Sequence, residues 1–120
     1  MAYLLACQEP LGMESRFISD AQISASSQYD EKHAAVQARL HYKANGVKRG
    51  GWSPLVSNQN QWLQVDLGAA ISVKGIATQG RSEYGQWVTA YKLEYSIDGA
   101  SFQYYKDPGR SANKVKHYDR

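Results

Sequence analysis

Cysteine is almost absent from this sequence, which limits how its fold can be held together. The 120 residues contain one cysteine, Cys7. A single cysteine excludes a disulfide within the chain, and cysteine usage alone is compatible with the cytosol. In a secreted protein, Cys7 would be either a free thiol or half of a bridge. No candidate base accompanies Cys7 in the sequence, so we do not expect it to act as a nucleophile.

Long hydrophobic runs are also missing. No stretch is long enough to cross a bilayer, and the opening MAYLLA is too short and lacks the basic residues of a complete secretory signal. We interpret it as a signal remnant, an exon boundary or an arbitrary start. There is no internal repeat, low-complexity tract or proline-rich linker. At 120 residues the chain is expected to form one domain with one core.

The motifs of the common enzyme classes are absent. The sequence has no GxSxG, HExxH, CxxC, P-loop or GxGxxG pattern, and no pair of carboxylates stands out. His33, His41 and His117 lack metal-ligand spacing and are interpreted as surface histidines. The sequence therefore predicts no enzyme, no catalytic residue, no metal site and no cofactor. Calcium held by backbone carbonyls would leave no motif and stays open as an alternative.

What the sequence does have is aromatic content and a small positive charge. Nine tyrosines and three tryptophans favour strands. A net charge of +3 and a pI near 9.0 permit attraction to anionic lipid, sulfated glycan or nucleic acid, and select none of them. The basic residues gather in two groups, which we interpret as solvated surface: Lys43, Lys48 and Arg49, and Arg110, Lys114, Lys116 and Arg120.

Several short segments alternate between apolar and polar residues, as half-buried strands do. The clearest is QWLQVDL, which places Leu63, Val65 and Leu67 on one face. Asp98 and Gly99 give a strong hairpin-turn signal. Strands are predicted at residues 21–26, 61–67, 71–78, 90–96 and 101–105. This number and spacing of strands predict an all-β sandwich or barrel.

Long polar stretches separate these strands. We call residues 28–36, 41–51 and 81–86 the first, second and third loops. Loops of this length are more often binding elements than connectors, although residues 34–40 have the character of a helical turn. Residues 106–120 contain few apolar side chains and are expected to form a loose tail.

A set of segments, taken together, resembles one known family. The segments, in chain order, are CQEPLGMES, ISDAQISASSQY, ARL, GGWSP, QWLQVDLG, GIATQGR and WVTAYKLEYSIDG. They are similar to the successive hallmarks of discoidin domains, also called coagulation factor V/VIII type C domains, and cover nearly all of residues 7–105. The resemblance extends to contactin-associated, neuropilin-like and clotting-factor-like members and does not select among them.

The resemblance implies a galactose-binding-like, distorted jelly-roll β-sandwich that is displayed outside the cell and binds ligands through three loops at one end. Family members also continue through further strands to a cysteine that pairs with the one near the start. Neither is present here, so a truncated domain over residues 7–105 and an atypical tail over residues 106–120 are expected. An incomplete sandwich or an unpaired Cys7 could then lead to self-association.

The resemblance also selects candidate ligand contacts on the loops. Several relatives place an exposed aromatic where Tyr29 stands, and Arg81 follows TQG as in the collagen-binding discoidin receptors. Those receptors use an acidic residue farther on, where this chain has Gln86 and Trp87. Neuropilin-like capture of a terminal arginine needs an aspartate where Ser57 stands. The full set of candidate contacts is Tyr29, His33, Lys48, Arg49, Arg81, Glu83 and Tyr84.

Four other polar or aromatic residues are expected to be structural. Trp52 and Trp62 are assigned to the core because large aromatics within family hallmarks usually pack. Arg39 and Asp66 are assigned to an internal ion pair. None of the four is expected to contact a ligand.

Together these features predict a non-catalytic, extracellular adhesion module that recognises a protein or glycan. Binding to an anionic phospholipid surface is the alternative, weakened by the polar first loop because membrane-inserting relatives carry bulky apolar tips there. A purely structural module in a larger adhesion protein, or a carbohydrate-binding accessory to an enzyme, are further alternatives. Nucleic acid is not expected as a partner.

Overall fold

The computed structural model describes residues 2–6, 9–106 and 115–117 as short strands and irregular segments with three single-turn 3-10 helices. Cys7 lies outside the described residues. The chain divides into two compact units, Met1–Gln86 and Trp87–Arg120. The elements are β1 (Ala2–Ala6), β2 (Glu9–Pro10), η1 (Asp20–Gln22), β3 (Ile23–Ala25), η2 (Glu31–His33), η3 (Ala35–Ala38), β4 (Leu63–Val65), β5 (Gly75–Thr78), β6 (Ala90–Lys92), β7 (Glu94–Tyr95), β8 (Gln103–Tyr104) and β9 (Val115–His117).

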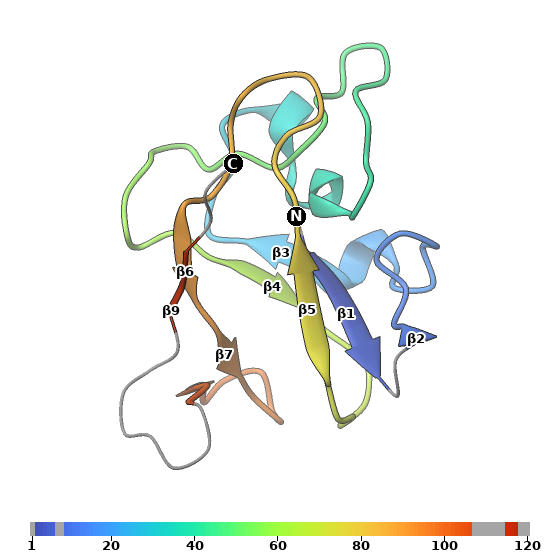
Figure 1. Ribbon diagram of the computed structural model, residues 1–120, viewed down its shortest axis with the longest axis vertical. Helices are drawn as coiled ribbons and strands as arrows, with labels where there is room; N and C mark the ends of the chain where they lie inside the picture. Colours follow the sequence, from blue (N-terminus) through green and yellow to red (C-terminus); the bar gives the residue numbers. More distant parts are fainter. Residues whose placement is uncertain (1, 7–8, 107–114, 118–120) are drawn as a thin grey trace. The chain divides into compact units, whose positions relative to one another are not determined.

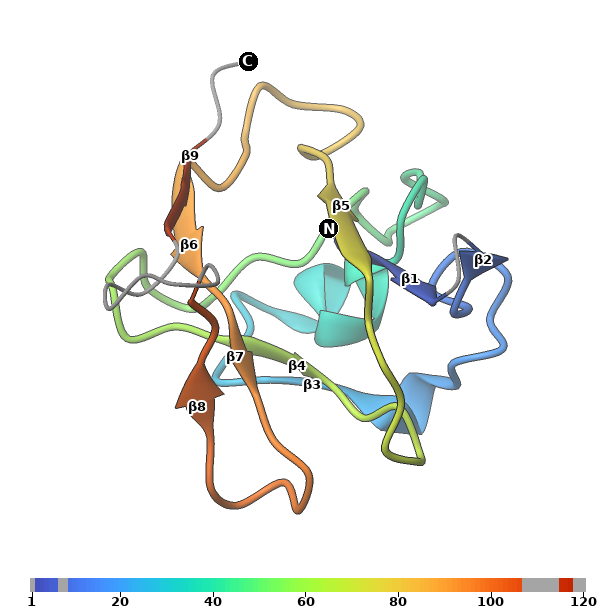
Figure 2. The ribbon, with the colours of Figure 1, turned by 60° about the horizontal axis from the view of Figure 1, so that its bottom comes forward.

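Two antiparallel sheets organise the first unit. One has the order β2-β1-β5 and the other pairs β3 with β4, and Figures 1 and 2 both show these strands side by side. Strand β1 pairs with β5 from Ala2 opposite Thr78 to Leu5 opposite Gly75. The sequence pattern predicts no strand at these opening residues. A short apolar stretch has no strand signature of its own, and here its partner, β5, lies some seventy positions away.

A small core forms where residues 11–18 pack against β3 and β4. Met13, Ile18 and Ile23 are buried, and Leu63, Val65, Leu67 and Ile76 pack against them. The predicted apolar face of residues 61–67 is therefore confirmed. Gly12 has a φ angle of +122° and lies in the turn before Met13. A glycine is needed at this position because a Cβ atom there would lie 2.6 Å from the Cβ atom of Phe17.

Two assignments made from the sequence are wrong. Trp62 is 48% exposed, because β4 turns Leu63 and Val65 toward the core and its neighbour therefore points to the opposite face. Trp52 is only half-buried, and its indole Nε1 donates to the Ser27 carbonyl at 2.8 Å. The tryptophan of GGWSP is thus held by a hydrogen bond to the backbone and is not a core side chain.

The expected ion pair between Arg39 and Asp66 is also wrong. The Arg39 guanidinium is buried and bonds instead to the Asp20 carboxylate at 2.7 Å and to the Met13 carbonyl at 2.9 Å. The Asp66 carboxylate accepts from the Gly68 amide at 2.8 Å within its own turn. Both residues act locally in the first unit, but with different partners.

The second unit contains the predicted hairpin. Strands β7 and β8 pair with Glu94 opposite Tyr104, and the turn between them contains Gly99 at φ +75°. The Asp98 carboxylate accepts from the Ser101 and Ala100 amides and from the Ser96 hydroxyl. These bonds lower the pKa of Asp98 to about 2.

The predicted loose tail stays a prediction. Strand β9, at Val115–His117, pairs with β6 in antiparallel register. Residues 107–114 and 118–120, most of the tail, lie outside the described residues.

Candidate functional site

The three long loops lie at the same end of the first unit (Figure 1). The first contains η2 and the start of η3, so the helical turn expected at residues 34–40 is present as a single 3-10 turn. The second closes on itself by an isolated bridge between Asn45 and Lys48, with Gly46 at φ +59°. The third closes by a hydrogen bond from the Arg81 amide to the Gln86 carbonyl at 2.8 Å.

A buried glutamine joins the first loop to the second. Gln37 is 1% exposed. Its Nε2 donates to the carbonyl of Lys32 in the first loop and to that of Arg49 in the second, the latter at 2.7 Å, and its Oε1 accepts from the Ala34 amide at 2.9 Å. One amide side chain therefore bonds to three backbone groups, and among the described residues it is the partner given for the Ala34 amide and the Arg49 carbonyl.

Backbone hydrogen bonds reinforce the same junction. The Arg49 amide donates to the Lys32 carbonyl at 2.9 Å, and the Tyr29 amide donates to the Ser53 carbonyl at 2.7 Å. The Lys48 ammonium also reaches the Glu31 carbonyl at 3.3 Å. The first two loops therefore form one hydrogen-bonded platform.

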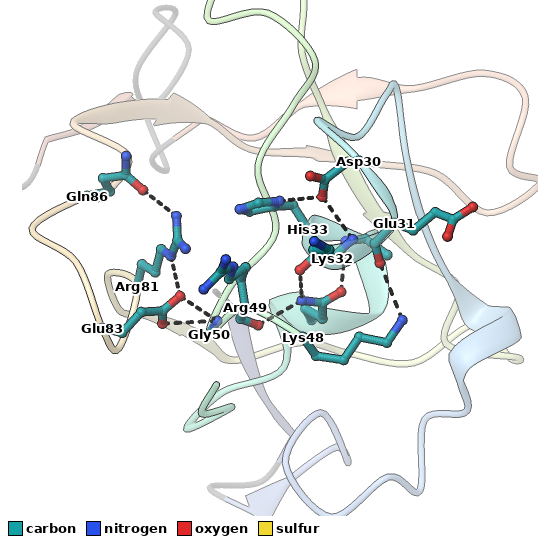
Figure 3. A network of polar contacts seen from close by, with 12 residues as sticks. Asp30, Glu31, Lys32, His33, Lys48, Arg49, Gly50, Arg81, Glu83 and Gln86 are labelled. Atoms are coloured by element: carbon teal, nitrogen blue, oxygen red, sulfur yellow. Dashed lines mark hydrogen bonds and ion pairs between the residues drawn. The ribbon is translucent and has the colours of Figure 1, made fainter. Parts of the chain in front are cut away.

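Glu83 ties the third loop to this platform, as Figure 3 shows. Its carboxylate accepts from the Gly50 amide at 3.0 Å, from the Arg81 Nε at 2.5 Å and from the Ser82 hydroxyl at 3.0 Å. Burial alone would raise the pKa of Glu83, but these hydrogen bonds outweigh it and lower the pKa to about 2. The carboxylate therefore stays ionised and its acceptor sites are occupied within the chain.

Asp30 is used internally in a similar way. Its carboxylate pairs with the His33 Nδ1 at 2.5 Å and accepts from the Lys32 amide at 2.8 Å, and the pKa of Asp30 is lowered chiefly by the bond to His33. The His33 ring is buried and packs edge-on against Tyr29, with ring centroids 5.4 Å apart. The expectation that His33 is a surface histidine is therefore wrong, because the loop folds over it.

The charge that remains on the loops is mainly positive. Within residues 9–106, no ion pair involves Lys32, Lys48 or Arg49, whereas Asp30 and Glu83 are both paired. Arg81 is neutralised by Glu83, donates to the Gln86 side chain and lies 4.6 Å from the Tyr84 ring centroid. In sequence the loop charges look mixed, but the fold pairs Asp30 and Glu83. Among residues 9–106, only Glu31 of the loop carboxylates is left without an ion pair, against the three basic side chains Lys32, Lys48 and Arg49.

Each loop also exposes one large apolar side chain: Tyr29 in the first, Val47 in the second and Tyr84 in the third. Their exposed fractions are 61%, 64% and 58%. The sequence analysis does not include Val47 among the candidate ligand contacts. The available signal was its position, because it is the one aliphatic side chain directly after the Asn45–Gly46 turn. A hollow of about 250 Å³ lies beside it, lined by Asp30, Glu31, Lys32, Val47 and Lys48.

The seven candidate contacts of the sequence analysis all lie on this three-loop end, but they have different roles in it. Tyr29, Lys48 and Tyr84 are exposed, and Arg49 is half-buried. The side chains of His33, Arg81 and Glu83 are engaged in internal bonds that shape the loops. As direct ligand contacts, all seven remain predictions.

The described part of the chain also gives no sign of a metal site or a membrane span. Among residues 2–6, 9–106 and 115–117, no three histidine, cysteine or acidic side chains converge as metal ligands. No helix in these residues is long and apolar enough to cross a membrane.

Comparison of the sequence with known proteins shows to which family the chain is similar. The sequence model of the F5/8 type C domain family matches residues 22–120. Lactadherin of Bos taurus is 38% identical over 117 residues, covering 93% of this chain and 27% of that protein. The human EGF-like repeat and discoidin I-like domain-containing protein 3 is 41% identical over 117 residues, covering 93% of this chain and 24% of that protein. The chain thus spans about a quarter of the length of these relatives.

Proposed function

This chain belongs to the F5/8 type C domain family, and from that premise we propose that it is a non-catalytic, extracellular module that binds an acidic protein or glycan through its three loops. The proposal includes the family's jelly-roll β-sandwich as the scaffold. One observation carries the choice of ligand: two of the three loop carboxylates, Asp30 and Glu83, are bonded within the chain. Among residues 9–106, Lys32, Lys48 and Arg49 have no ion pair and outnumber the one unpaired loop carboxylate, Glu31. Such a surface attracts anions and repels cations.

The test uses surface-bound heparin as a polyanionic probe at two concentrations of NaCl. The double substitution Lys48→Gln with Arg49→Gln should weaken binding about tenfold or more and reduce its salt dependence, because two charge-assisted contacts are lost. Lys74→Gln removes an exposed charge outside the loops and should leave binding unchanged. Equal affinities of the double variant and the Lys74 control would contradict the proposal.

An anionic membrane surface is the second candidate, and the exposed tips of the loops favour it. Tyr29, Val47 and Tyr84 are all exposed, Lys48 directly follows Val47, and the Arg81 guanidinium lies over the Tyr84 ring. Aromatic and aliphatic side chains flanked by cations suit the interface of an anionic bilayer. The polar first loop that weakened this alternative in sequence does display an aromatic at its start.

Flotation with phosphatidylserine vesicles at low and high salt separates the two candidates. For a membrane ligand, binding persists at high salt, and replacing Tyr29, Val47 and Tyr84 together with alanine abolishes it, because apolar insertion is not screened. For a soluble polyanion, vesicle binding is weak and disappears at high salt. The alanine variant then keeps most of its affinity for heparin.

A further inference from the structure

A second hollow lies away from the junction of the three loops, where the start of the second loop meets the N-terminal turn. It has a volume of about 240 Å³ and is lined by Glu14, Arg16, Arg39, Leu40, His41, Tyr42, Lys43 and Asn45. It shares no lining residue with the hollow beside Val47. Its volume is below that of a typical drug-sized pocket and suits a single small group.

The backbone is unusual at two points of this hollow. Arg16 and His41 have φ angles of +69° and +59°, and among the described residues they are the only ones other than glycine in the left-handed region. His41 is held there by a bond from its amide to the Gln79 side chain at 2.8 Å and by a contact of its ring with Glu14. Backbone strain of this kind is found preferentially where a chain binds something.

The wall of the hollow contains a further anomaly. Arg39 Nε is the one buried side-chain nitrogen or oxygen in the described residues that has no hydrogen-bond partner. The two terminal nitrogens of the same guanidinium are satisfied by Asp20 and Met13. A buried N–H group without an acceptor calls for an explanation. The Arg39 Nε is therefore a donor that is still available for a hydrogen bond.

The side chains that face solvent here are mostly donors. Arg16 is 60% exposed and has only a long 3.8 Å contact to Asp20, and Lys43 is exposed without an ion pair among residues 9–106. Glu14 is the only acidic residue of the lining, and the His41 ring lies against it. The lining contains the three cations Arg16, Arg39 and Lys43. The carboxylates of Glu14 and of Asp20, which pairs with Arg39, offset two of these charges, so the hollow has an excess of positive charge.

From the coincidence of these features we propose that the hollow is a binding site for a tetrahedral oxyanion, a sulfate or phosphate group carried by a larger ligand. Arg16 and Lys43 supply the charge-assisted hydrogen bonds, Tyr42 and Asn45 supply neutral donors, and Arg39 fixes the wall. The site includes the start of the second loop but none of Lys32, Lys48 and Arg49, so it does not depend on the proposed function.

The first experiment is a titration of the labelled chain with sodium sulfate, followed by amide NMR at constant ionic strength maintained with NaCl. Saturable shifts are expected in residues 14–16 and 39–45. Arg16→Gln and Lys43→Gln should each weaken sulfate binding about tenfold, because each removes a charged donor. Lys74→Gln should leave it unchanged. Shifts that do not saturate, or equal affinity in all variants, would overturn the site.

A second variant separates binding from folding. Arg16→Gly removes the cation and also suits the left-handed backbone, so it should raise the midpoint of thermal unfolding while weakening sulfate binding. Arg16→Gln should weaken binding without that gain in stability. If Arg16→Gly binds sulfate as well as the native chain, Arg16 does not contact the anion and the proposal is wrong.

The source of the oxyanion is distinguished with small esters. N-acetylglucosamine 6-sulfate represents a sulfated glycan and glycerol 3-phosphate represents a lipid headgroup. The ester with the higher affinity indicates whether the oxyanion belongs to a glycan or to a lipid headgroup. Both esters should compete with sulfate. If uncharged N-acetylglucosamine shifts the same amides, the hollow recognises the sugar and not the oxyanion.

Discussion

Gln37 and Glu83 show how single side chains can shape a binding surface without facing the ligand. Each bonds to backbone groups of a neighbouring loop, Gln37 to Arg49 and Glu83 to Gly50. Their polar atoms are occupied by the chain itself. We therefore interpret them as positioning residues, and their substitution should act on the shape of the loops.

For Gln37, replacement by methionine keeps most of the volume and removes every hydrogen bond. The Arg49 carbonyl and the Ala34 amide then lose the hydrogen bond that Gln37 supplies, so the free energy of unfolding should fall by roughly 2–4 kcal/mol. Urea denaturation measures this change. Gln28→Met, the same substitution at an exposed position of the first loop, is the matched control and should change stability by less than about 0.5 kcal/mol. Similar losses in the two variants would contradict the role of Gln37.

For Glu83, the lowered pKa predicts a specific pH dependence. The group has a pKa of about 2 in the folded chain against an ordinary value of 4.5, so ionisation favours the folded state. The stabilisation is complete above about pH 4.5 and is lost as the pH falls toward 2. The difference in unfolding free energy between the native chain and Glu83→Gln should therefore shrink over this range. Chemical denaturation at several pH values tests it, and a constant difference would rule it out.

At the scale of elements, the close contact between the second and third loops depends on Gly50. A Cβ atom at this position would lie 2.0 Å from the Ser82 hydroxyl and 2.3 Å from a Glu83 carboxylate oxygen. The neighbouring Gly51 has room, since its nearest contact would be at 3.8 Å. The two adjacent glycines of GGWSP thus have different roles, one at the junction of two loops and one beside it.

Gly50→Ala should separate these loops, whereas Gly51→Ala should not. We expect a loss of about 1–3 kcal/mol in unfolding free energy for Gly50→Ala, because overpacking forces the third loop away. Affinity for the heparin probe should fall with it, since Lys48 and Arg49 precede this glycine directly. Denaturation and heparin binding, measured on both variants, check the prediction. Equal behaviour of the two would mean that the loops are independent.

At the scale of the whole molecule, burial is uneven along the chain. Among residues 9–106, every buried side chain belongs to the first unit, and residues 87–106 include none. Two hydrogen bonds of equal length, 2.8 Å, allow a direct comparison: the Asp66 amide to the Gln22 carbonyl in the first unit, and the Tyr105 amide to the Leu93 carbonyl in the second.

Native-state hydrogen exchange should therefore differ between these two amides. The Asp66 amide lies beside the core strands β3 and β4 and should exchange at least about tenfold more slowly than the Tyr105 amide, because local opening is easier where few apolar contacts are lost. NMR-detected exchange on the full chain measures both. Comparable protection would indicate that the two units unfold together.

Features that depend on local patterns could be predicted from the sequence alone. Alternation located β4 and its core face, and the Asp98–Gly99 pair located the β7–β8 turn. The polar stretches located the three loops, because each of these signals is contained within a few consecutive residues. The hallmark segments gave the family, which the comparisons then showed.

Only the tertiary structure decided which polar side chains are free to meet a partner. Arg39 lies in the same chain as many carboxylates, and only folding selects Asp20 over Asp66. His33, Asp30 and Glu83 look like exposed loop residues until the neighbouring loops close over or bond to them. Partner choice among charged groups depends on distances between segments far apart in sequence, and local patterns contain no record of those distances.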